Sequence, residues 1–176
     1  TSLLAKEAAL LTRIASSGTL EIAGLKTRYH GDYHLGQVLL AGNDFVIIDV
    51  EGEPGQNIDE RRAKSSPLRD VASMLRSFNR ARFSALEKQA TTGAERDRLD
   101  PGARAWEQAA RGAFLSAYAD TMAAGPSPRR IDHGLVTLFE LEKALCELRY
   151  ELNNRTHWAT APLQSILALI DDSPHK

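Results

Sequence analysis

Two short apolar runs separated by Gly-Asn-Asp are the feature that most restricts the fold of this chain. The runs cover residues 38–41 and 45–50, and the second is rich in β-branched residues. Runs of this kind form strands, and a Gly-Asn pair between two strands is typical of a tight turn. A single β-hairpin is therefore predicted here.

The sequence on both sides of the hairpin has the periodicity of amphipathic helices, with apolar residues recurring every three or four positions. Helices are expected over residues 2–15, from residue 67 onward, around 106–117, around 138–152 and over 162–169. Ser66 is expected to cap the second of these, because proline follows it. Residues 51–66 and 91–102 are rich in polar side chains and are predicted to be loops. The fold class is mainly α (α+β), a helical bundle with a short hairpin.

The composition excludes several kinds of partner. The 176 residues carry 22 Lys and Arg against 23 Asp and Glu, so the net charge of -1 attracts neither nucleic acid nor an anionic membrane. No apolar stretch approaches the ~18 residues of a membrane span, no signal peptide opens the sequence, and a single cysteine cannot form an internal disulfide. We expect one cytoplasmic domain over residues 1–176, with a catalytic region at 27–51 and a helical substrate region at about 67–171.

Polar residues lie in the loop that leads into the hairpin and at the far end of its second strand. Asp32 and Gln37 stand five residues apart in the loop, and Asp49 lies near the end of the second apolar run. The two ends of a hairpin are neighbours, so Gln37 and Asp49 are expected to lie close together. Phosphoryl transfer from ATP needs a carboxylate that orients the attacking hydroxyl and oxygen ligands for Mg²⁺. Asp32 is the candidate base, with Gln37 and Asp49 as ligands of magnesium and nucleotide.

Three neighbouring residues have supporting roles in this scheme. Glu51 would face the same side as Asp49 on an extended strand, and is a candidate ligand for a second metal. His30 is assigned to the catalytic group as a residue that fixes the loop backbone, and His34 as a packing residue. The alternative is that these aspartates and histidines make ordinary turn and packing contacts, but the joint spacing favours a kinase site.

Residues 30–37, His-Gly-Asp-Tyr-His-Leu-Gly-Gln, resemble the phosphotransferase motif of aminoglycoside and choline kinase relatives. Gln37, at the proposed metal-binding position, is similar to the glutamine that maltokinases carry there. Further blocks that carry this resemblance lie at residues 48–54, 61–72, 140–145 and 149–155. The chain thus resembles the maltokinase unit that is often fused to trehalose synthase.

This resemblance implies the carboxy-terminal lobe of a protein-kinase-like fold, using ATP and Mg²⁺. The implied reaction is phosphorylation of maltose at its anomeric hydroxyl to give maltose 1-phosphate. A glycine-rich phosphate loop and a nucleotide-binding lysine before the catalytic loop are missing from this sequence. The expected partners are therefore an amino-terminal nucleotide lobe outside the chain and a possible fused trehalose synthase domain.

The helix expected around residues 138–152 offers a candidate sugar site. Glu147, Tyr150, Glu151 and Asn154 fall at i, i+3, i+4 and i+7 and so share one face. Carboxylates and an amide bind sugar hydroxyls, and an aromatic ring packs on the apolar face of a pyranose. The alternative is a solvated face on which Glu151 pairs with Arg155.

Three functional hypotheses follow. The chain is the catalytic lobe of a maltokinase, a phosphotransferase for another hydroxylated substrate such as an aminoglycoside, or a catalytically silent module. An exposed apolar surface where a second lobe docks would also favour self-association of the chain.

Overall fold

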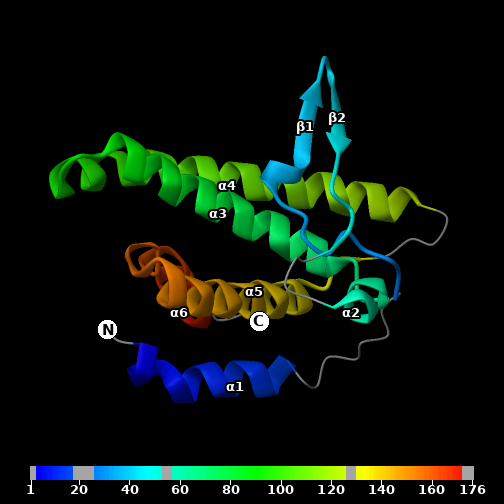
Figure 1. Cartoon of the computed structure of the whole chain (residues 1–176), viewed down its shortest axis with the longest axis horizontal. Coiled ribbons are helices and arrows are strands. Elements are labelled where there is room, and N and C mark those ends of the chain that lie inside the picture. Colours follow the sequence, from blue (N-terminus) through cyan, green and yellow to red (C-terminus); the bar gives the residue numbers. More distant parts are fainter. Residues whose placement is uncertain (1–2, 18–25, 53–56, 126–129, 172–176) are drawn as a thin grey trace. The chain divides into compact units, whose positions relative to one another are not determined.

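The computed structural model describes residues 3–17, 26–52, 57–125 and 130–171, which are mainly helical with one small sheet (Figure 1). The helices are α1 (Glu7–Ser17), α2 (Ile58–Arg62), α3 (Leu68–Gln89), α4 (Gly93–Ala124), α5 (His133–Asn154) and α6 (Thr160–Asp171), with 3₁₀ turns η1 (Leu3–Lys6), η2 (Leu35–Gln37) and η3 (Thr156–Trp158). Strands β1 (Val38–Ala41) and β2 (Asp44–Ile47) form the sheet. The mainly α class is confirmed. Within the described ranges, none of the helices has the length and apolarity needed to cross a bilayer.

The predicted hairpin is present, with a shorter second strand than expected. Pairing runs from Val38 with Ile47 to Ala41 with Asp44, which leaves Gly42 and Asn43 as the turn. Gly42 has φ +65°, the conformation that the first turn position of a tight hairpin requires. The strand ends at Ile47 and not at residue 50, because Asp49 has φ +59° and cannot continue an extended chain.

Both faces of the hairpin carry exposed apolar side chains. Leu40 and Phe45, which pair across the strands, are 71% and 69% exposed. Leu39, Val46 and Ile47 are exposed as well. Exposed apolar side chains of this kind favour association. The self-association expected from the surface on which a second lobe would dock stays a prediction.

Two helix starts lie in segments that were predicted to be loops. Asn57 caps α2 and Thr92 caps α4, and in each case the glutamate three residues later bonds back to the cap. These capping boxes are visible in the sequence as Asn57 with Glu60 and Thr92 with Glu95. Pro101 lies inside α4, beyond its first turn, and the helix continues past it to Ala124.

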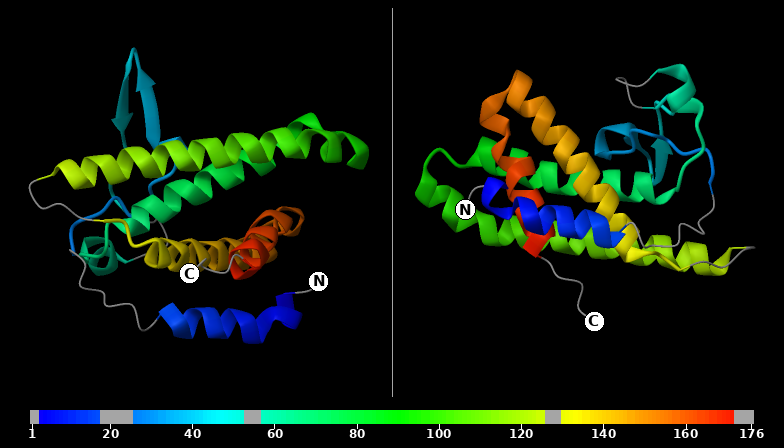
Figure 2. Two further views of the ribbon diagram at one scale, coloured as in Figure 1. Left: turned by 180° about the vertical axis from the view of Figure 1, so that it is seen from behind. Right: turned by 90° about the horizontal axis from the view of Figure 1, so that it is seen from below.

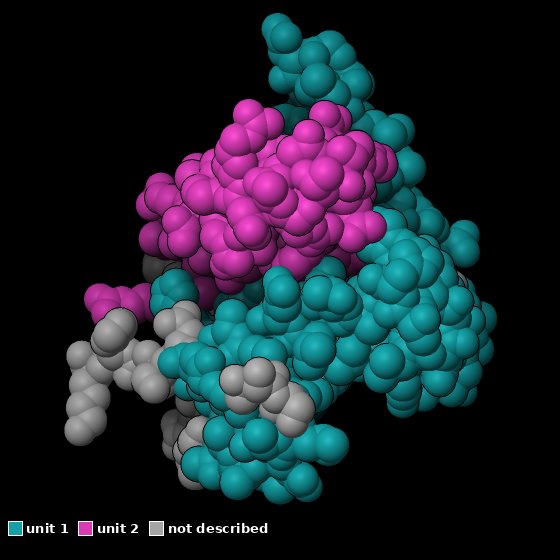
Figure 3. All heavy atoms as spheres, turned by 90° about the vertical axis from the view of Figure 1, so that its left-hand side faces the viewer, with its two compact units in different colours: residues 1–74, 132–176 teal, residues 75–131 magenta. Residues whose placement is uncertain are grey.

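The chain divides into two compact units, one of residues 1–74 and 132–176 and one of residues 75–131 (Figure 3). In the first unit, α5 and α6 pack side by side and α1 contacts both (Figure 2). Its buried core consists of Leu141, Ala144, Leu148, Ala159 and Ile166. As predicted, Ser66 caps α3, and its hydroxyl accepts the N–H of Leu68.

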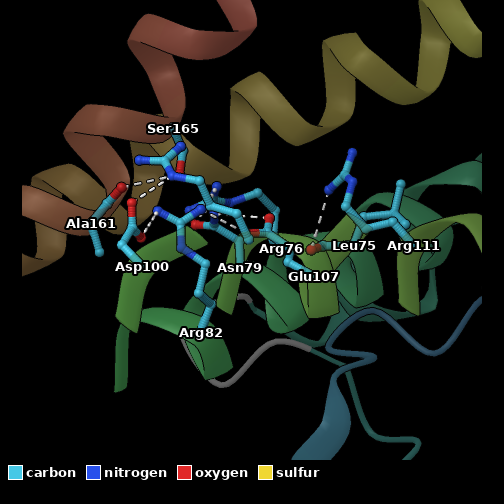
Figure 4. A network of polar contacts seen from close by, with 10 residues as sticks. Leu75, Arg76, Asn79, Arg82, Asp100, Glu107, Arg111, Ala161 and Ser165 are labelled. Carbon is cyan, nitrogen blue, oxygen red and sulfur yellow. Dashed lines mark hydrogen bonds and ion pairs between the residues drawn. The ribbon is translucent and has the colours of Figure 1, made fainter. Parts of the chain in front are cut away.

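The second unit contains the rest of α3 and all of α4. The Phe78 ring makes edge contacts with Trp106 and Phe114, at centroid distances of 6.3 and 6.0 Å. The same unit holds a buried polar network, in which Glu107 accepts hydrogen bonds from Asn79 and Arg82 (Figure 4). The second unit therefore combines a cluster of aromatic rings, of which Phe78 is buried and Trp106 is 48% exposed, with a buried ion pair.

Candidate active site

The loop that carries Asp32 is anchored to the first turn of α3. One carboxylate oxygen of Asp70 accepts the N–H of His30 at 2.7 Å, and the other accepts the N–H of Gly31 at 3.0 Å. From the sequence, Asp70 is an ordinary acidic residue in the first turn of a helix, a position that the helix dipole favours. Its actual partners, His30 and Gly31, lie 40 and 39 positions away in the sequence, so no local pattern could reveal them.

His30 braces the same loop from the inside. Its Nδ1 accepts the N–H of Asp32 at 3.3 Å, which leaves the ring proton on Nε2, where it donates to the carbonyl of Ile48 at 2.9 Å. Both ring nitrogens are therefore bonded to backbone groups, and the residue is 9% exposed. In this position His30 ties the candidate base to the end of the hairpin, and the geometry assigns it no proton-transfer role.

The Asp32 carboxylate lies between two nitrogen-bearing side chains. Its Oδ2 is 3.6 Å from Nε2 of His34, and its Oδ1 is 3.6 Å from Nζ of Lys143 on α5. The Asp32 side chain is 22% exposed, so a hydroxyl group can reach it. Sequence reasoning placed Asp32 in the site but missed Lys143, which lies on a distant helix.

His34 is oriented by the turn that follows it. Its Nδ1 accepts the N–H of Gly36 at 3.0 Å, so the neutral ring carries its proton on the nitrogen that faces Asp32. A Cβ at residue 36 would lie 2.8 Å from Cε1 of His34, too close for the ring to stay in place. Gly36 is therefore needed for this orientation.

Gln37 and Asp49 meet at the base of the hairpin. The side-chain amide of Gln37 donates to Oδ2 of Asp49 at 3.0 Å, and the backbone carbonyl of Gln37 accepts the N–H of Ile48 at 3.0 Å. Asp49 has a left-handed backbone, which aspartate adopts more readily than most other non-glycine residues. Strained residues of this kind cluster at functional sites.

The expectation for Glu51 rested on an extended strand, and that basis is wrong. β2 ends at Ile47, and the left-handed backbone at Asp49 turns the chain before residue 51. Glu51 is exposed in the following turn. Its proposed metal role stays a prediction without a geometric argument.

The donor set suits a cation that is shared with phosphate groups. In the described ranges, no group of three or more His, Cys, Asp or Glu side chains could hold a metal ion. Mg²⁺ in phosphotransferases commonly uses one or two protein oxygens and takes its other ligands from phosphates and water. The Gln37 and Asp49 oxygens fit that pattern, and ATP would have to complete it.

The four residues of the predicted sugar face lie on α5 in different environments. Glu151 is 4% exposed, and Arg155 donates to both of its carboxylate oxygens at 3.0 and 2.8 Å. Asn154 donates to the carbonyl of Tyr150 at 2.8 Å, and Tyr150 is 55% exposed. Glu147 is half-buried. The pair of Glu151 with Arg155 was expected under the alternative in which this face binds no sugar. Sugar binding by this face stays a prediction.

A pH dependence is expected from Asp70. Burial raises the pKa of its carboxyl above the ordinary aspartate value, while the N–H groups of His30 and Gly31 act in the opposite direction. A raised pKa means that the folded state binds this proton more tightly than the unfolded state. The contribution of Asp70 to stability is therefore largest below the ordinary pKa and declines as the pH rises through the raised value.

Urea unfolding of the wild type and of Asp70→Asn, measured from about pH 4 to pH 7, tests this expectation. The free energy of unfolding of the wild type should fall relative to that of the variant as the pH rises. A difference that is constant or increases with pH would contradict the assignment.

The chain is similar to glucosamine kinases. It is 28% identical over 144 residues to the glucosamine kinase of Streptacidiphilus jiangxiensis and 30% identical over 158 residues to that of Mycolicibacterium smegmatis. These matches cover 81% and 88% of the chain. They cover 31% and 38% of the two relatives, so the chain spans about a third of their length.

Solved structures of glucosamine kinase have the same fold over most of the chain. One crystal form matches with a TM-score of 0.76 and 27% identity, over 92% of this chain and 39% of that protein. A complex with glucosamine, ADP and inorganic phosphate matches with a TM-score of 0.75 and 27% identity, over 92% of this chain and 38% of that protein. No family model matches the sequence.

These comparisons correct the resemblance that was drawn from the motifs. The relatives found are glucosamine kinases and neither maltokinases nor aminoglycoside phosphotransferases, so the expectation of maltose 1-phosphate was wrong. A trehalose synthase fusion loses its basis for the same reason. The motifs misled because a base and oxygen ligands serve phosphoryl transfer to any hydroxyl group, whereas the substrate is selected elsewhere.

Proposed function

We propose that this chain carries the catalytic groups of an ATP-dependent sugar kinase whose acceptor is an amino sugar, with glucosamine as the first candidate. The observation that carries the proposal is the grouping of Asp32, Gln37 and Asp49 around one hairpin, in a chain that matches glucosamine kinases over more than four fifths of its length. ADP in the complex of a solved relative supports ATP as the phosphoryl donor.

In the proposed reaction, Asp32 orients the acceptor hydroxyl and takes its proton. The hydroxyl oxygen forms a bond to the γ-phosphorus of ATP, and the bond between that phosphorus and the bridging β,γ-oxygen breaks, so that ADP leaves. The anchors at Asp70 and His30 fix the loop, which keeps the Asp32 carboxylate in place during this step. The contribution of the protein is mainly positioning.

Gln37 and Asp49 are the proposed ligands of Mg²⁺. When bound, the ion would neutralise negative charge on the phosphate groups of ATP. The hydrogen bond between Gln37 and Asp49 holds the amide next to the carboxylate. The amide oxygen of Gln37 and the second carboxylate oxygen of Asp49 could then bind a cation.

The α5 face is the proposed site for the sugar. The ammonium group of an amino sugar is attracted by carboxylates such as that of Glu147, and the exposed Tyr150 ring offers an apolar surface for a pyranose. In this proposal Glu151 and Asn154 belong to the same face. Glu151 holds Arg155 near the Tyr150 ring, with the guanidinium carbon 5.6 Å from the ring centroid.

The test is an acceptor panel assayed with the full-length protein, because a nucleotide lobe outside these 176 residues remains part of the proposal. ADP release and product mass would be measured with ATP, Mg²⁺ and glucosamine, glucose, maltose, trehalose or an aminoglycoside. We expect glucosamine to give the highest kcat/KM and maltose to give no product. Transfer to another acceptor but not to glucosamine would refute the substrate assignment, and no transfer to any acceptor would refute the kinase assignment.

A further inference from the structure

Lys143 lies beside the candidate base Asp32, although it has no role in the proposed reaction. Its Nζ is 3.6 Å from Oδ1 of Asp32, and both side chains are 22% exposed. A hydrogen bond between charged groups normally measures about 2.7–2.9 Å, so this contact is a looser ion pair. The separation leaves room for a hydroxyl proton to approach the carboxylate.

The position of Lys143 on α5 connects the base with the proposed sugar face. Lys143, Glu147 and Tyr150 stand at i, i+4 and i+7, so they share one face of the helix. At a rise of about 1.5 Å per residue, Glu147 lies roughly 6 Å and Tyr150 roughly 10 Å along the axis from Lys143. One pyranose ring is long enough to bridge the first of these intervals.

We propose that Lys143 is a positioning residue that fixes the rotation of the Asp32 carboxylate from the helix that carries the sugar face. This inference rests on the proposed function, and it adds a residue through which the sugar site and the base are held together. His34 faces the other carboxylate oxygen, so each oxygen of Asp32 has a nitrogen group beside it, one from the loop and one from α5. A partly exposed ion pair adds little to stability, and the effect of Lys143 is therefore on turnover.

The first test compares Lys143→Met and Lys143→Arg with the wild type in the full-length protein, using the best acceptor of the panel. Lys143→Met should lower kcat roughly 10²-fold, the cost of a carboxylate displaced by about 1 Å. KM for ATP should change less than twofold and the melting temperature should be unaltered. Lys143→Arg keeps the charge and should recover part of the lost rate, although its planar group differs in geometry. Lys88→Met, at an exposed position near the end of α3, is the matched control with unchanged kinetics.

A double-variant cycle distinguishes action through Asp32 from a separate role. In the Asp32→Asn background, Lys143→Met should cause no further loss of rate, because the group that it positions is already disabled. A further tenfold loss, a lowered melting temperature that accounts for the rate, or no effect of Lys143→Met alone would each overturn the proposal.

The orientation of the Asp32 carboxylate can be measured even if the acceptor panel shows no transfer. A crystal structure of full-length Lys143→Met should show the Asp32 carboxylate rotated away from its wild-type orientation, whereas Lys88→Met should not. An unchanged carboxylate would overturn the role of Lys143 whatever the substrate is. Failure of the panel with a rotated carboxylate would instead overturn only the proposed function.

Discussion

Replacing Asp32 by asparagine in the full-length protein is expected to lower kcat about 10³-fold, within the range that a positioned general base contributes. Asparagine has nearly the same shape, but it carries no negative charge to accept the acceptor proton. The change leaves the anchors of the loop intact, because Asp70 and His30 bond to backbone groups. The measurement is the steady-state rate of ADP release at saturating ATP and sugar.

Asp97→Asn, an exposed change on α4, is the matched control and should retain the wild-type rate. Circular dichroism melting of both variants would verify that they are folded. If Asp32→Asn kept more than a tenth of the wild-type rate, Asp32 could not be the base, and the proposed reaction would need another proton acceptor.

Removing the Glu107 side chain is expected to destabilise the chain by about 3–5 kcal/mol, the range found when one partner of a buried ion pair is deleted. Glu107 is 8% exposed, and its two oxygens accept hydrogen bonds from Asn79 at 3.0 Å and Arg82 at 2.8 Å. In Glu107→Ala, Arg82 keeps only the longer contact with Asp100, at 3.4 Å, among its ion pairs in the described part of the chain. Urea unfolding of the 176-residue chain measures the change.

Glu87→Ala provides the matched control, because the Glu87 carboxylate pairs with Arg96 on the exposed surface. That change should cost under about 1 kcal/mol. The double variant Glu107→Met with Arg82→Met should cost less than Glu107→Ala alone, since it leaves no buried charge without its main partner. A loss below about 1 kcal/mol for Glu107→Ala would show that the network contributes little to stability.

The parts of the fold that local chemistry determines could be predicted from the sequence. The hairpin follows from Gly42 between two apolar runs, and the start of α3 follows from Ser66 and Pro67. The start of α4 was missed because the polar composition of residues 91–102 was given more weight than the capping box at Thr92. The early end of β2 depends on the backbone of Asp49, which no alternation pattern reveals.

In the candidate site too, the features that depend on local sequence were predicted and those that depend on tertiary packing were missed. Gln37 and Asp49 were expected to meet because the pairing of a hairpin brings its ends together, and their side chains do bond. Asp70 and Lys143 could not be found, because their importance comes from contacts with residues 30–32 that only tertiary packing creates. The acceptor was wrongly predicted because the loop chemistry is the same for many hydroxylated substrates.

At Asp49, the left-handed backbone lowers stability, whereas the side chain is needed for the proposed activity. A glycine there would relieve a conformational strain of about 1 kcal/mol, but it would remove a proposed metal ligand. Selection for thermal tolerance alone would therefore favour Asp49→Gly, and selection for turnover would reject it. An engineer who seeks a more robust protein should leave this residue unchanged and look for stabilising changes elsewhere in the chain.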